Sequence, residues 1–167
     1  WVTKHDAHRQ TAIMVSAGPY LDYGALHKFV KENPEAKMLA VKHAYPHLME
    51  HGITPWGCIL LDPRPITGKS THNIVRKDLF KNIDLNTNFF LASMTDPSVT
   101  NFMIDKGVKL YGWHAFTDSL REESEQGQQI QNQQVKIAED LGIPQGATMI
   151  TGGTCAAMRG IGMLHTM

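Results

Sequence analysis

The chain has 167 residues, a length typical of one domain with its own apolar core. Sixteen lysines and arginines balance sixteen aspartates and glutamates, and this zero net charge argues against a nucleic-acid binder that works through a basic field. No apolar run approaches the ~18 residues of a membrane span. The two cysteines, Cys58 and Cys155, are too far apart for a C-x-x-C motif or a disulfide framework. We therefore expect a cytoplasmic globular protein with no membrane or nucleic-acid partner.

Short apolar runs alternate with stretches of helical periodicity along the chain. We predict strands at residues 11–15, 38–41, 56–61, 88–94, 108–113 and 147–151. The predicted helices cover residues 20–31, 46–51, 96–106 and 130–141, and another begins near Cys155. Strand–helix alternation is typical of βαβ units. The sequence predicts an α/β fold, a three-layer Rossmann-like domain with a mostly parallel sheet of about six strands. We expect residues 1–167 to form one such domain of a longer chain.

Two segments lack clear periodicity. Residues 63–87 read as a long connection with one turn of helix near Leu79. Residues 121–134 are rich in glutamine and glutamate, which predicts either a plain solvated loop or a lid that orders over a ligand.

Small residues follow the first and the last predicted strands, at the edge where α/β folds bind ligands near a switch point. Ser16, Ala17, Gly18 and Pro19 join a strand to a helix, so backbone N–H groups could bind a phosphate, with Pro19 in the first helical turn. The alternative is an ordinary tight turn. Gly152, Gly153 and Thr154 repeat this pattern after the last strand, where the alternative is a glycine bend that lets the helix pack closely.

Two further residues at strand ends could take part in catalysis. Asp62 directly follows an apolar strand, and a carboxylate there could hold Mg²⁺ or orient an attacking hydroxyl; we expect it to be hydrated. His114 ends the fifth strand and could act as an acid or base, or donate to a phosphate; the alternative is a histidine bonded to backbone. Asp96 has a similar position, but it is better placed as a helix N-cap.

Two segments resemble familiar motifs but lack what those motifs need. Gly68-Lys69-Ser70-Thr71 resembles the end of a P-loop, but Pro63 stands where that motif needs glycine; Lys69 and Arg64 remain possible mobile phosphate contacts. The H-x-x-E-H pattern from His47 to His51 lies in a helix too short for a zinc protease.

An ordered set of segments resembles the 6-hydroxymethylpterin diphosphokinase MptE-like family, which also occurs within glycosyltransferase-like proteins that modify flagellin. The matching segments are residues 12–21, 48–55, 61–63 and the Gly152-Gly153-Thr154 turn, although Tyr20 replaces the usual serine after Gly-Pro. The resemblance implies a Rossmann-like fold, a nucleotide-phosphate site and Mg²⁺-dependent transfer of diphosphate from ATP to a pterin hydroxymethyl group.

The leading hypothesis is therefore a transferase with a nucleotide and a small acceptor as its partners. Its donor phosphates would lie at Gly18 and Gly152-Gly153, with Asp62 on Mg²⁺ or on the acceptor hydroxyl. Two alternatives stay open: a glycosyltransferase that uses a nucleotide sugar, and a non-catalytic nucleotide-binding module of a larger protein.

Overall fold

The computed structural model describes residues 11–18, 20–66 and 80–113, together with positions 136, 140, 160, 161 and 164. In chain order the elements are β1 (Ala12–Val15), α1 (Tyr23–Glu32), β2 (Lys37–Val41), α2 (Ala44–Glu50), β3 (Gly57–Leu60), β4 (Asn88–Ala92), α3 (Pro97–Asp105) and β5 (Lys109–Trp113). Each agrees in type with the prediction. The predicted strand at 147–151 and the segment at 121–134 lie outside these residues.

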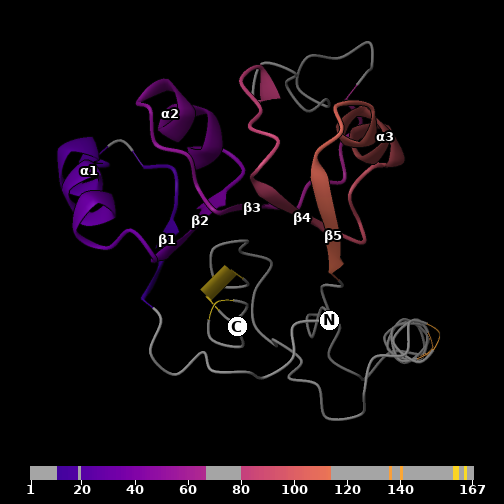
Figure 1. Ribbon diagram of the computed structural model, residues 1–167. Coiled ribbons are helices and arrows are strands. Elements are labelled where there is room, and N and C mark those ends of the chain that lie inside the picture. Colours follow the sequence, from indigo (N-terminus) through magenta and orange to yellow (C-terminus); the bar gives the residue numbers. More distant parts are fainter. Residues whose placement is uncertain are drawn as a thin grey trace.

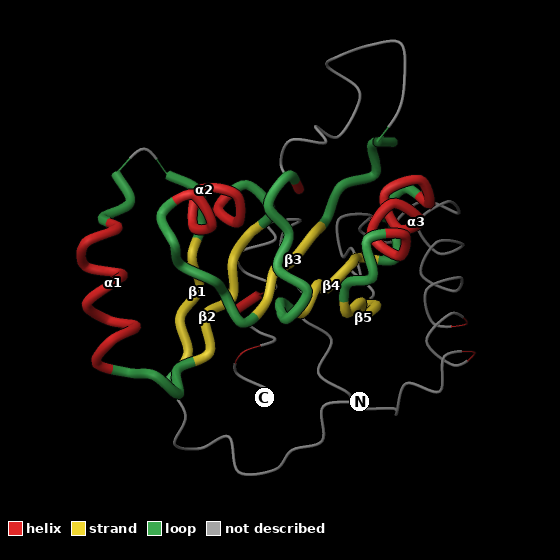
Figure 2. Tube along the Cα trace, turned by 45° about the horizontal axis from the view of Figure 1, so that its top comes forward, coloured by secondary structure: helices red, strands yellow, loops and turns green. Residues whose placement is uncertain are grey.

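The five strands form one parallel sheet in the order β1-β2-β3-β4-β5. The crossover between parallel strands is right-handed. When each new strand is added on the same side of the previous one, all the crossover helices lie on the same face of the sheet. Accordingly, α1, α2 and α3 all lie on one side of it (Figures 1 and 2). The strand order does not reverse within the described sheet, so the expected switch point is not among these five strands. The carboxyl ends of all five parallel strands still meet at one edge of the sheet, which is where ligands are expected to bind.

Local signals in the sequence determine where the helices begin and end. Asp96 Oδ1 accepts a hydrogen bond from Ser98 N at 2.9 Å, so Asp96 is the N-cap of α3, as predicted. Gly52 and Gly107, with φ of 70° and 72°, follow α2 and α3 in the left-handed conformation that glycine favours. None of the described helices has the length and apolar composition to cross a membrane.

The start of α1 differs from the prediction. The helix begins at Tyr23 rather than Tyr20, because the Asp22 side chain accepts a hydrogen bond from Ala25 N at 2.9 Å and caps it there. A turn containing Tyr20 therefore separates Gly18 from the helix. Pro19, predicted in the first helical turn, precedes the helix and is itself outside the described residues.

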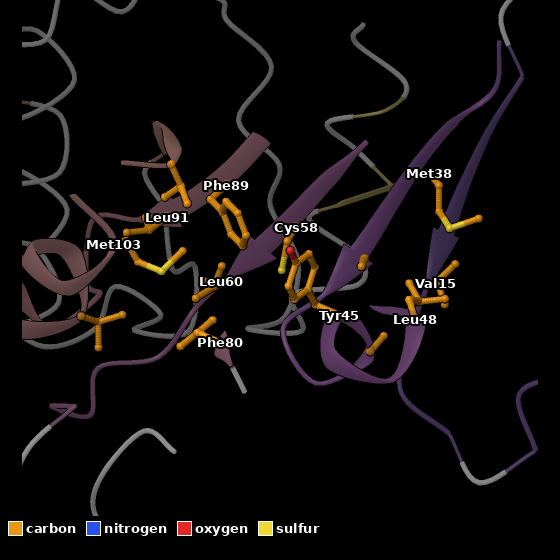
Figure 3. Packing of buried hydrophobic residues seen from close by; sticks show 14 of the residues in the cluster. Val15, Met38, Tyr45, Leu48, Cys58, Leu60, Phe80, Phe89, Leu91 and Met103 are labelled. Carbon is orange, nitrogen blue, oxygen red and sulfur yellow. The ribbon is translucent and has the colours of Figure 1, made fainter. Parts of the chain in front are cut away.

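The main core lies between the sheet and its three helices. Alternate residues of the strands point to this side and pack against Tyr45 and Leu48 of α2 and Met103 of α3 (Figure 3). Tyr45 is fully buried; its ring meets Phe89 edge-on at 5.2 Å between centroids, and its hydroxyl accepts a hydrogen bond from Asp84 N at 2.9 Å. The β3–β4 connection, whose helical turn was predicted near Leu79, brings Phe80 into the same core.

The opposite face of the sheet has its own smaller cluster of buried residues, Leu39, Ile59 and Phe90, against which Leu164 packs. Gly160 lies on this face as well: a Cβ built on it would be 2.6 Å from Met14 Sδ and 3.2 Å from Leu39 Cδ2. The described positions Gly160, Ile161 and Leu164 are helical, as expected for the helix predicted from about Cys155. Helical residues thus contact both faces of the sheet.

We predict that Gly57→Ala destabilises the fold. A Cβ at Gly57 would be 2.9 Å from both Leu39 Cδ1 and Phe90 Cε2, so the second cluster would have to shift. Overpacking of this kind costs about 1–3 kcal/mol of unfolding free energy, measurable by urea denaturation. Gly18→Ala is the matched control, because a Cβ there meets no atom of the described chain within 4 Å. Equal stability of the two variants would contradict this account of the second face.

Candidate functional site at the carboxyl edge of the sheet

A buried lysine stands at the carboxyl end of β2. Lys42 is only 6% exposed, and its backbone N–H extends the sheet by donating to the Ile59 carbonyl at 3.1 Å. Its side chain runs along the edge to β3, where Nζ pairs with Asp62 Oδ2. A lysine is seldom this buried unless it has a charged partner, so the position of Lys42 depends on Asp62.

Asp62 at the end of β3 is held from two sides. The Arg64 guanidinium donates from Nε to Oδ1 at 2.8 Å and from Nη2 to Oδ2 at 2.7 Å, while Arg64 N donates to Oδ1 at 3.1 Å. Asp62 is 3% exposed, so the expectation of a hydrated carboxylate is wrong. Arg64 was expected as a mobile charge, but its guanidinium binds the Asp62 carboxylate through two nitrogens. Its side chain is 42% exposed.

Lys42, Asp62 and Arg64 together carry one net positive charge. Burial alone would raise the pKa of Asp62, but the hydrogen bonds from Arg64 and Lys42 outweigh it and hold that pKa well below its usual value. The carboxylate therefore stays ionised at neutral pH, with two cations around one anion. Burial, and then the charge of Lys42, lowers the pKa of the neighbouring His43, which is consequently neutral at pH 7.

The end of β4 adds polar groups beside this cluster. Asp96 N donates to the Asp62 carbonyl at 3.4 Å, so the turn after β4 lies against the end of β3. Thr95 in this turn is 8% exposed, and its hydroxyl has no hydrogen-bond partner within the described chain. The Asp96 carboxylate is occupied by Ser98, whose hydroxyl donates to it at 2.6 Å. The Thr95 hydroxyl therefore has unused hydrogen-bonding capacity within the described chain.

The turn after β1 is exposed but offers less to an anion than the sequence suggested. Ser16, Ala17 and Gly18 are all exposed, and Gly18 has free space where a side chain would be. The N-terminus of α1, however, already interacts with the Asp22 carboxylate. A phosphate at this turn would have to use the turn's own backbone N–H groups, without the helix N-terminus.

Several predicted site residues are outside the described part of the chain. These are Pro19, His114, Gly152, Gly153 and Thr154. Their assignments as phosphate-binding residues and, for His114, as a catalytic residue remain predictions.

The histidines of α2 have ordinary structural contacts. His47 Nδ1 lies 3.4 Å from Glu50 Oε2, and the His51 ring stacks on Tyr23 with 3.6 Å between centroids. In the described ranges there is no group of three or more histidine, cysteine, aspartate or glutamate side chains suited to a metal ion. The H-x-x-E-H pattern lies in α2, a helix of seven residues whose Ala44, Tyr45 and Leu48 are buried.

Lys42 was assigned no role from the sequence. The signal that could have identified it is a lysine placed directly after a fully apolar strand, where the expected residue is a small or hydroxylic turn former. Its pairing with a strand-end aspartate 20 positions later follows from parallel neighbours in the sheet, which local patterns do not reveal.

Comparison with protein families gives one match. Residues 2–145 match the family described as 6-hydroxymethylpterin diphosphokinase MptE-like. No curated protein and no solved structure matches the chain. The matched range contains the whole described sheet and the cluster of Lys42, Asp62 and Arg64.

We predict that Asp62→Asn lowers the free energy of unfolding at about pH 7 by about 3 kcal/mol, because it leaves Lys42 buried without a charged partner. The pKa of Asp62 is lower in the folded than in the unfolded chain. Its stabilising effect is therefore complete above the unfolded pKa, near about 4, and is lost as the pH falls towards the folded value.

Urea denaturation of both proteins at about pH 7, 5 and 3 measures this difference. We expect the gap between wild type and variant to be largest at the highest pH and to shrink at the lowest. A gap that does not change with pH would show that the charge of Asp62 is not what stabilises the edge.

Proposed function

Because the chain belongs to the 6-hydroxymethylpterin diphosphokinase MptE-like family, we propose that it is a transferase that binds the phosphates of a nucleotide donor at the carboxyl edge of its sheet. The observation that supports this most directly is the pair of cations, Lys42 and Arg64, fixed at the ends of β2 and β3. In its finer form the proposal is transfer of diphosphate from ATP to the hydroxymethyl group of a pterin-type acceptor.

The proposed reaction makes limited demands on the protein. The acceptor oxygen attacks the β-phosphorus of ATP, the bond from that phosphorus to the oxygen bridging to the α-phosphorus breaks, and AMP leaves. Catalysis of such transfers depends on positioning and on stabilising charge on the phosphate oxygens. Two fixed cations supply the charge, and His114 is our candidate to accept the proton of the attacking hydroxyl.

The described residues do not fit the expected Mg²⁺ at Asp62. Mg²⁺ takes oxygen ligands in octahedral geometry, usually one or two carboxylates with waters and substrate phosphates. Both oxygens of Asp62 are already bonded by Arg64 and Lys42, and a metal at this carboxylate would face two neighbouring cations. We derive no catalytic step through a metal held by Asp62.

A panel of donors tests the proposal. We expect turnover of ATP to AMP when a hydroxymethylpterin is supplied, followed by chromatography of the nucleotides. Release of sugar from a nucleotide sugar, with no AMP formed from ATP, would instead establish the glycosyltransferase alternative. Tight nucleotide binding with no turnover of any donor would point to a non-catalytic module.

A second prediction concerns the turn after β1. Gly18→Val should weaken ATP binding roughly tenfold by blocking the approach of a phosphate to backbone N–H groups. The variant should fold, since a Cβ at Gly18 meets nothing within 4 Å in the described chain. Isothermal titration with ATP, CTP and UTP gives the affinities, with Gly18→Ala as the smaller control. Unchanged affinity in the folded Gly18→Val variant would remove this turn from the site.

A further inference from the structure

The hydrogen bonds that Asp62 accepts limit what its carboxylate can do chemically. A carboxylate that receives three side-chain hydrogen bonds from an arginine and a lysine is a poor base and a poor metal ligand, because its lone pairs are in use. The same carboxylate fixes Lys42 Nζ and the Arg64 guanidinium in place. Asp62 is therefore suited to position the two cations.

We propose that Lys42, Arg64 and Thr95 form a metal-independent binding site for a diphosphate group, with Asp62 as the positioning residue. This deepens the proposed function and rests on it for the nucleotide that would bear the diphosphate. The following observations support the site itself.

Lys42 and Arg64 each keep hydrogen-bond donors that Asp62 does not use. An ammonium group has three donors, and the described chain uses one of those of Lys42, on Asp62. Arg64 uses Nε and Nη2 on Asp62, which leaves its other guanidinium N–H groups on a side chain that is 42% exposed. The Asp96 carboxylate next to the cluster is engaged by Ser98. The remaining N–H donors of Lys42 and Arg64 are thus available to an anion, and phosphate is an anion whose geometry the arginine fork matches.

Thr95 provides an independent indication of a ligand. A buried hydroxyl without a partner costs free energy, so a fold does not gain stability by keeping one. The hydroxyl of Thr95 is in this state, and the contact of Asp96 N with the Asp62 carbonyl brings its turn against the charged cluster. A phosphate oxygen bound between the ends of β3 and β4 would provide the missing partner.

The test uses inorganic pyrophosphate as the probe, titrated calorimetrically into the full chain in excess EDTA and again in MgCl₂. We expect binding in EDTA. Lys42→Met and Arg64→Gln should each raise the dissociation constant about 10- to 100-fold, the range for loss of a hydrogen bond to a charged group. Lys106→Gln is the charge-matched control, because Lys106 follows α3 at the other edge of the sheet, and its affinity should equal that of the wild type.

Two features keep the test decisive if a variant is unstable. Lys42→Met could fail to fold because it removes a cation that pairs with the buried Asp62. Arg64→Gln alters a side chain that is 42% exposed and leaves the Lys42–Asp62 pair in place. Thr95→Val should raise the dissociation constant about 3- to 10-fold without lowering the melting temperature, since the hydroxyl has no bond within the described chain to lose. Thr95→Ser, which keeps the hydroxyl, should bind as the wild type does.

The outcomes separate this inference from the proposed function. Pyrophosphate binding that requires Mg²⁺ and is lost in Asp62→Asn would overturn the inference and leave a metal-dependent transferase. Absence of pyrophosphate binding in both buffers, or equal affinity in Arg64→Gln and wild type, would overturn it as well. Binding in EDTA that depends on Arg64, without turnover of any nucleotide, would support the diphosphate site and refute the transferase.

Discussion

The carboxyl edge of this protein depends on one electrostatic requirement, the need of a buried ammonium group for a counter-ion. Moving Lys42 out of water is costly, and its partner Asp62 must give up water too. Ion pairs of this kind contribute little net stability compared with an apolar contact of the same size. Their presence at the one edge shared by all strand ends is therefore better explained by what the charges do than by how firmly they hold the fold.

The sequential order of the strands has a structural cost and a functional benefit. The helices α1, α2 and α3 all cover one face of the sheet and leave its opposite face without them. Gly160 and Leu164, which are distant in sequence, pack on that opposite face. The benefit is that successive strands are also neighbours. Lys42 and Asp62 follow β2 and β3 and pair with each other, and the turn that follows β4 contacts the Asp62 backbone through Asp96 N.

The fold was more predictable than the chemistry of its edge. Apolar periodicity and helix caps such as Asp96 are local signals, and they gave the type and order of every described element. Asp62 was also singled out, but its burial and its partners were not predicted, because the neighbouring strand sets them. The start of α1 was missed for a local reason: the side chain of Asp22 caps the helix N-terminus, three residues after Pro19.

The contact of Gly160 with Met14 also has a consequence for how the chain folds. These residues are 146 positions apart (160 minus 14), so closing this face requires a very long loop, whereas each βαβ step on the other face joins near neighbours. The helix-covered face can therefore assemble during synthesis, as its strands emerge one after another. The contact of Leu164 with Leu39, Ile59 and Phe90 forms only after this distal residue has been synthesised. Until then these apolar side chains lack that contact, which favours association with other chains or with a chaperone.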